Sequence, residues 1–312
     1  MTEEKAYYSK LLLFGEYSVI CDSMGLTVPL KMFTAHWRFK EGGPKTNSPD
    51  SNFELGLFYN YLAELHEKGD LLADLNLNLF ATELKDGLYF DSKIPQGFGV
   101  GSSGALCAAI YERYTATPVD IHPGNEEQII ALKNQLAQME CYFHGVSSGL
   151  DPLLCYLQQP LLIKNKQEIG FAHVPDNLHF NDFSVFLINT GVIGKTGPLV
   201  NQFFDQCRQH RFYSRFVNQL IPANNQCIKA IVEGDTDLLF ENLALLSGFF
   251  YEHFTPMIPE SFRPAWQNGL KTGDYFLKLC GSGGGGFLLG FTKNISAVKQ
   301  YFGSTGNDLI ML

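Results

Sequence analysis

An apolar run covers residues 7–20 (YYSKLLLFGEYSVI), and the second half of residues 26–39 (LTVPLKMFTAHWRF) alternates apolar and polar side chains. A period of two is typical of a strand with one buried face. Asp22–Gly25, between the two runs, has the composition of a turn. The pattern therefore predicts a pair of strands at the start of the chain.

A helix is predicted over about 53–68, because four apolar residues there are spaced four apart and would share one face. They are Phe53, Leu57, Tyr61 and Leu65. Residues 41–52, just before it, have the composition of a loop. Residues 87–95 (GLYFDSKIP) predict a strand that leads into a glycine-rich stretch.

Three more helices are predicted after this stretch. One covers SSGALCAAIYERY from Ser102, and a long one covers EEQIIALKNQLAQMECYFHG and stops at Gly145. The third begins at Asp151 and Pro152, since Asp is a favoured N-cap and Pro a favoured first helical residue.

The second half of the chain predicts both strands and helices. Strand-like runs lie at 160–164 and 183–191, helical patterns at roughly 197–219, 224–233 and 236–250, and a hairpin at 274–291. A chain of 312 residues exceeds the usual size of one hydrophobic core, so two domains are expected, residues 1–178 and 179–312. The predicted class is α/β.

Composition and charge exclude several kinds of protein. The chain is 45% hydrophobic and 18% charged, which is typical of a globular protein. A net charge of −9 without a basic run argues against nucleic-acid and anionic-membrane partners. The seven cysteines are scattered and never spaced Cys-x-x-Cys, which predicts reduced thiols. An acidic amino terminus and the lack of a long apolar run predict a cytoplasmic location.

The stretch PQGFGVGSSGAL at 95–106 carries the clearest candidate chemistry. It contains Gly-x-Gly-x-x-Gly, but two serines lie inside the pattern and a turn-rich segment follows, which argues against a dinucleotide site. A Walker loop is excluded here because no Gly-Lys-Ser/Thr lies in this stretch. Glycine amides and a helix starting near Ser102 would suit a phosphate. The alternative is a plain connector with a serine N-cap.

Two acidic residues in MECYFHGVSSGLDP form a second candidate. Glu140 lies near the end of its helix, where a negative charge is poorly placed relative to the helix dipole and invites a cation. A surface glutamate is the simpler alternative. Asp151 could be only an N-cap, or it could be a carboxylate held ionised as a base that orients a hydroxyl group.

Two further features stay ambiguous on their own. The Gly281–Gly286 run is longer than a tight hairpin turn needs, which favours either a close backbone approach or a flexible loop tip. Lys10 interrupts an apolar strand, where its amine could reach solvent or could be a fixed charge beside a phosphoryl group.

Together and in this order, the four motifs resemble those of the GHMP kinase superfamily of small-molecule kinases, and the mevalonate kinases within it most closely. The motifs are KLLLFGEYSVI, PQGFGVGSSGAL, HGVSSGLD and KLCGSGGGGF, and they span residues 10–286. The resemblance implies an amino-terminal domain like ribosomal protein S5 domain 2, a ferredoxin-like carboxy-terminal domain, and an active site between them.

The resemblance also implies a role for each matching residue. Asp151 would be the catalytic aspartate, paired with Lys10, while Ser103 and Glu140 would bind Mg²⁺. The residues expected around ATP are Pro95, Gly97, Gly99, Gly101, Ser102, Ser103 and Gly104. Those expected on the substrate side are Glu16, Tyr17, Gly281, Gly283 and Gly284.

The implied reaction transfers the ATP γ-phosphoryl group to a primary hydroxyl, with mevalonate as the expected acceptor. Phosphomevalonate or another small alcohol is the alternative within enzymes, and a catalytically dead nucleotide-binding regulator is the alternative outside them. The chain departs from the family pattern at three places: Tyr8-Ser9-Lys10 replaces the usual Pro-Gly-Lys, Tyr17 replaces a histidine, and Gly104 replaces an alanine. The Tyr17 change weakens the assignment of the acceptor most. A homodimer is expected from family habit alone.

Overall fold

The computed structural model combines helices with two antiparallel sheets, which confirms the predicted mixed α/β class. It describes residues 5–40, 51–119, 121, 126–175, 178, 180–194 and 196–312. No helix among these residues is both long and apolar enough to cross a membrane. All seven cysteines are free, as predicted, and four of them are buried.

The chain divides into two compact units, each built from separate segments. The first contains residues 1–10, 29–95 and 101–159, and the second contains 11–28, 96–100 and 160–312. The division therefore passes through both the first strand, β1 (Tyr7–Phe14), and the glycine-rich stretch at 95–106. The single boundary between residues 178 and 179 stays a prediction.

The amino-terminal sheet has the strand order β1-β2-β4-β5, and β3 pairs with the outer part of β2. Its strands are β1 (Tyr7–Phe14), β2 (Gly25–Phe39), β3 (Leu88–Ser92), β4 (Leu161–Asn165) and β5 (Glu168–Phe171). The predicted strand pair at 7–39 is confirmed, with a short 3₁₀ turn at Ser18–Cys21 before the return strand. β5 had no prediction.

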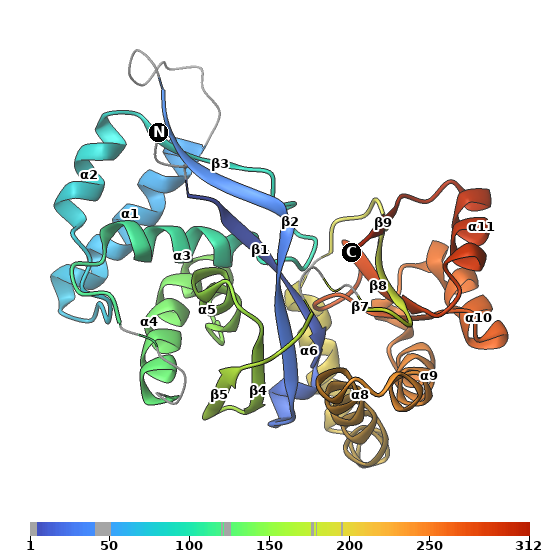
Figure 1. Cartoon of the computed structure of the whole chain (residues 1–312). Helices are drawn as coiled ribbons and strands as arrows, with labels where there is room; N and C mark the ends of the chain where they lie inside the picture. Colours follow the sequence, from blue (N-terminus) through green and yellow to red (C-terminus); the bar gives the residue numbers. More distant parts are fainter. Residues whose placement is uncertain are drawn as a thin grey trace. The chain divides into compact units, whose positions relative to one another are not determined.

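Among the residues that the structure describes, five α-helices belong to the first unit. They are α1 (Ser51–Lys68), α2 (Leu77–Lys85), α3 (Ser102–Tyr114), α4 (Glu126–His144) and α5 (Leu150–Leu157). Gly145 follows α4 with φ +73°, the left-handed stop that the sequence predicts. Of these helices, α2 alone was not predicted from the sequence. α3 packs directly against both α4 and α5 (Figure 1).

The predicted buried face of α1 is wrong, although the helix itself is confirmed. Phe53 is 65% exposed, whereas Leu55, Phe58 and Leu62 are buried. These three follow the i, i+3, i+7 spacing of one helical stripe. The ring of Phe58 stacks on Tyr142 of α4 at 5.0 Å, so the position of the neighbouring helix selects this stripe.

The second sheet lies entirely in the second unit, in the order β7-β8-β6-β9. Its strands are β6 (Ser184–Asn189), β7 (Phe276–Leu279), β8 (Phe287–Thr292) and β9 (Leu309–Met311). β7 and β8 form the predicted hairpin around the glycine run. Helices intervene between β6 and β7 and between β8 and β9, which gives a β-α-β-β-α-β element order.

The helices of the second unit precede and follow this hairpin. They are α6 (Thr196–Cys207), α7 (His210–Arg215), α8 (Ile221–Glu233), α9 (Thr236–His253), α10 (Arg263–Thr272) and α11 (Ile295–Thr305). The stretch predicted as helical over 197–219 is interrupted after Cys207 and ends in a π-helical turn at Phe216–Leu220. α9 and α10 pack on β7, and α11 packs on β9.

Candidate functional site

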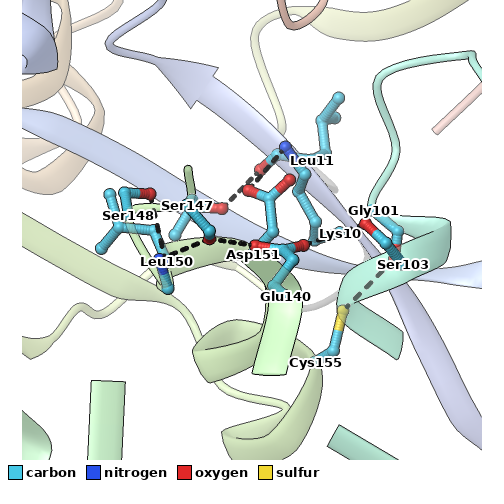
Figure 2. A network of polar contacts seen from close by, with 12 residues as sticks. Lys10, Leu11, Gly101, Ser103, Glu140, Ser147, Ser148, Leu150, Asp151 and Cys155 are labelled. Atoms are coloured by element: carbon cyan, nitrogen blue, oxygen red, sulfur yellow. Dashed lines mark hydrogen bonds and ion pairs between the residues drawn. The ribbon is translucent and has the colours of Figure 1, made fainter. Parts of the chain in front are cut away.

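A buried lysine and an aspartate form the centre of the candidate site in the first unit. Lys10, on β1, is only 4% exposed, and its Nζ lies 2.9 Å from Oδ1 of Asp151 (Figure 2). The Asp151 side chain keeps 40% of its surface exposed. A buried ammonium ion is costly without a partner, so this ion pair fixes both groups. The Asp151 carboxylate is thus both held in place and accessible.

The predicted N-cap role of Asp151 is wrong. α5 begins one residue earlier, and Gly149 occupies the cap position with φ +74°. A Cβ at Gly149 would lie 2.2 Å from the Lys133 carbonyl oxygen, so only glycine fits there. Asp151 therefore lies in the first helical turn, where the dipole favours a negative charge and its side chain can contact Lys10.

Glu140 and Ser103 meet beside this ion pair, as Figure 2 shows. The Ser103 hydroxyl, in the first turn of α3, donates to Oε1 of buried Glu140 at 2.9 Å. Ser147 donates to the other carboxylate oxygen at 2.5 Å. The Glu140 carboxylate thus points into the site, and it is not the surface residue of the simpler alternative.

His144 and Ser147 were not predicted as part of this site. His144 Nε2 lies 3.0 Å from the Ser103 hydroxyl. Its spacing of four residues from Glu140 on α4 was the available signal, because residues four apart share a helix face. Ser147 carried no signal, since its contact depends on the path of the loop after α4.

Burial and the neighbouring Asp151 carboxylate raise the pKa of Glu140 to about 7, against the lowering effect of its two serine partners and Lys10. The folded protein therefore binds this proton more tightly than the unfolded chain does. Stability is expected to fall by up to about 3 kcal/mol as pH rises from about 4.5 to 7. Glu140→Gln should remove that slope in urea unfolding measured across pH, and an unchanged slope would contradict the shift.

Two glycines let α3 approach the Lys10–Asp151 pair closely. Gly101 caps α3 with φ +79°, and a Cβ there would lie 2.5 Å from Cγ of Lys10. At Gly104 a Cβ would lie 2.9 Å from the carbonyl carbon of Asp151 and from the nitrogen of Pro152. The contact between α3 and α5 therefore explains why this chain has glycine where the family pattern has alanine.

Gly104→Ala is expected to destabilise the protein by about 1–3 kcal/mol, because backbone atoms of α5 cannot yield as a flexible side chain would. Gly56→Ala is the matched control: it lies in a helix of the same unit, and a Cβ added there would have nothing within 4 Å. This control should stabilise by about 0.5–1 kcal/mol. Equal effects of both variants in denaturant unfolding would show that the α3–α5 contact is looser than described.

The first turn of α3 provides hydrogen-bond donors beside these groups. N–H groups at a helix start have no carbonyl partner inside the helix and attract anions. Ser102 and Ser103 occupy these positions, and the Ala105 N–H donates to the Gly101 carbonyl at 2.9 Å. The start of α3 can therefore accommodate an anion beside the Asp151 carboxylate and the Lys10 ammonium group.

The other predicted site residues lie in the second unit, except for half-buried Pro95. Glu16 pairs with Lys278 on β7 at 2.5 Å, and both side chains are 1% exposed. The Tyr17 hydroxyl donates to the Ser282 carbonyl at 2.7 Å. Lys278 was not predicted, although a charged residue within an apolar strand was the same signal that pointed to Lys10.

Both glycine-rich segments of the second unit pack backbone against backbone. A Cβ at Gly99 would lie 2.8 Å from the Cys280 carbonyl oxygen, and one at Gly286 would lie 2.6 Å from Cα of Phe98. Gly284 donates to the Met257 carbonyl at 2.6 Å. This packing favours the close-approach interpretation of the glycine run over the flexible loop tip.

The donors around Ser103 suit a hard cation such as Mg²⁺. Ser103 Oγ and Glu140 Oε1 lie 2.9 Å apart, and a hydroxyl and a carboxylate are oxygen ligands of the kind that Mg²⁺ takes. The described residues contain no group of three or more His, Cys, Asp or Glu side chains placed to hold a metal. Further ligands would have to come from a phosphate or from water, as is common for Mg²⁺.

The solved structures that this chain resembles include kinases of small molecules. No protein-family model and no curated protein matches the chain. The fold is that of the GHMP kinases, which confirms the predicted resemblance at the level of the fold. The structure of Leishmania major mevalonate kinase in complex with R-mevalonate is similar, with a TM-score of 0.64, 15% identity and coverage of 97% of this chain and 92% of that one.

Two other solved structures show the breadth of this likeness. Streptococcus pneumoniae phosphomevalonate kinase, in complex with phosphomevalonate and AMPPNP, has a TM-score of 0.67, 13% identity and 99% coverage of both chains. Lactococcus lactis galactokinase, complexed with galactose, has a TM-score of 0.64 and 14% identity, with coverage of 99% of this chain and 93% of that one. At such identities the likeness concerns the fold and leaves the acceptor open.

Proposed function

We propose that this protein is an ATP-dependent kinase that phosphorylates a primary hydroxyl, with mevalonate as the acceptor. The observation that carries the proposal is the Lys10–Asp151 ion pair beside the Ser103–Glu140 contact at the start of α3. A fixed cation, an accessible carboxylate and a helix start are the parts that phosphoryl transfer uses for positioning and charge neutralisation.

In the proposed reaction, Asp151 orients the acceptor hydroxyl and takes its proton. The acceptor oxygen forms a bond to the γ-phosphorus as the bond to the ADP oxygen breaks. Lys10 holds the Asp151 carboxylate in place and offsets negative charge on the transferred group. The N–H groups at the start of α3 hold the nucleotide phosphates. Ser103 and Glu140 would hold Mg²⁺, which neutralises phosphate charge when bound.

An ATP-consumption assay over a panel of acceptors tests the proposal. The panel contains mevalonate, phosphomevalonate, galactose and homoserine, each with Mg²⁺ and with formation of the phosphorylated product followed directly. Turnover with mevalonate alone supports the assignment. Turnover with phosphomevalonate would favour the second candidate, which the fold likeness to phosphomevalonate kinase also supports. ATP binding without turnover on any acceptor would identify a regulatory relative.

Phosphomevalonate, the second candidate acceptor, carries a phosphate group, so its site would need extra basic residues. Arg38 is one candidate; it is half exposed and lies 3.8 Å from the Asp91 carboxylate in the first unit. Lys195, the other candidate, lies outside the described residues. The acceptor panel therefore decides between mevalonate and phosphomevalonate.

A further inference from the structure

Two consecutive residues of the second unit contact β7 and the glycine run that follows it. The Glu16 carboxylate pairs with Lys278 at 2.5 Å, and the Lys278 ammonium also donates to the Leu279 carbonyl at 2.9 Å. The hydroxyl group of Tyr17, the residue after Glu16, donates to the Ser282 carbonyl inside the run at 2.7 Å. The chain is thus held at Lys278, near the end of β7, and at Ser282, the second residue of the glycine run.

The backbone of Tyr17 is held in a conformation that residues with a side chain seldom adopt. Its φ is +63° and its ψ is −35°, and such strain persists only where the surroundings impose it. The ring lies 4.8 Å from the ring of Phe203 and 5.0 Å from that of Phe254, and Tyr17 is only 5% exposed. The ring is therefore packed into the unit, and its hydroxyl points to the glycine run.

The glycine run in turn contacts residues 96–100, the first half of the stretch expected around ATP. A Cβ added at Gly281 would lie 3.3 Å from Cα of Gly99, and one added at Gly286 would lie 2.6 Å from Cα of Phe98. The Phe98 ring also lies 5.1 Å from that of Phe287, the first residue of β8. A displacement of the run would therefore displace residues 96–100.

We propose that Glu16 and Tyr17 are positioning residues for the nucleotide, and that they act through Gly281–Gly286 on residues 96–100. The family resemblance implies instead that both lie on the substrate side. Neither side chain is presented to a ligand, since both are buried and both contact residues 278–282. This inference rests on the proposed kinase function.

Tyr17→Phe tests the inference, because it removes one hydroxyl and keeps the packed ring. We expect about tenfold weaker binding of AMPPNP with Mg²⁺ in calorimetry, with the Michaelis constant for mevalonate changed less than about twofold. The control is Tyr275→Phe, which removes a buried hydroxyl that donates to the Ala265 carbonyl at 2.7 Å and accepts from the Asn268 side-chain amide at 3.2 Å. This control should lower the melting temperature similarly and leave AMPPNP affinity unchanged.

Glu16→Gln is a second variant that keeps the size of the side chain and removes its charge. AMPPNP affinity should fall here too, and Glu16→Gln combined with Lys278→Met should recover part of it because no buried charge is left alone. A changed Michaelis constant for mevalonate, together with unchanged AMPPNP affinity, would overturn the inference. Failure of the wild-type protein to bind AMPPNP would instead overturn the proposed function.

Discussion

Asp151→Asn is expected to reduce kcat by about a thousandfold while ATP affinity changes less than about twofold. Positioned proton acceptors commonly contribute 10²–10⁴-fold to rate, and asparagine keeps the shape of the side chain but cannot accept the proton. Asp151 contacts Lys10, and its exposed side chain leaves space for an acceptor hydroxyl. Single-turnover assays separate the chemical step from product release, and calorimetry with AMPPNP measures the nucleotide affinity.

The same exchange at Asp91 is a suitable control for this variant. Asp91 lies in the first unit, half exposed beside Arg38, and has no place in the candidate site. Asp91→Asn should keep wild-type turnover. A kcat for Asp151→Asn within about threefold of wild type would remove Asp151 from the mechanism.

Strands and hairpins with clear patterns were predictable from the sequence. The alternation over residues 26–39 and the apolar runs on both sides of the glycines specify β2, β7 and β8, because period and turn composition are local properties. The buried face of α1 was not predictable. Its sequence offers two apolar stripes, and only the position of α4 decides that Phe58 faces inward.

The candidate site was predictable where a motif groups its residues. Ser103, Glu140 and Asp151 lie in short segments with distinctive spacing, and the structure brings Ser103 and Glu140 into contact. The Glu16–Lys278 pair joins residues 262 positions apart, so no local pattern could reveal it. Tyr17 shows the same limit, because its hydrogen bond to Ser282 depends on the pairing of distant segments.

Lys10→Met is expected to lower kcat by about a hundredfold or more. Removing one group that stabilises developing charge typically costs 10²–10³-fold, and loss of this cation also leaves Asp151 without its ion-pair partner. Methionine retains an apolar stem that can pack on Gly101, so the fold should survive and near-wild-type far-UV circular dichroism is expected.

Lys10→Arg separates charge from geometry at the same position. The lysine stem already contacts Gly101, and the planar guanidinium group is wider than an ammonium group. Lys10→Arg therefore keeps the positive charge but should retain less than about a tenth of the wild-type kcat. Lys164→Met, which removes an exposed lysine paired with Glu168, should leave kcat unchanged. Full activity of both Lys10 variants would mean that the buried ion pair holds β1 against α5 and takes no part in phosphoryl transfer.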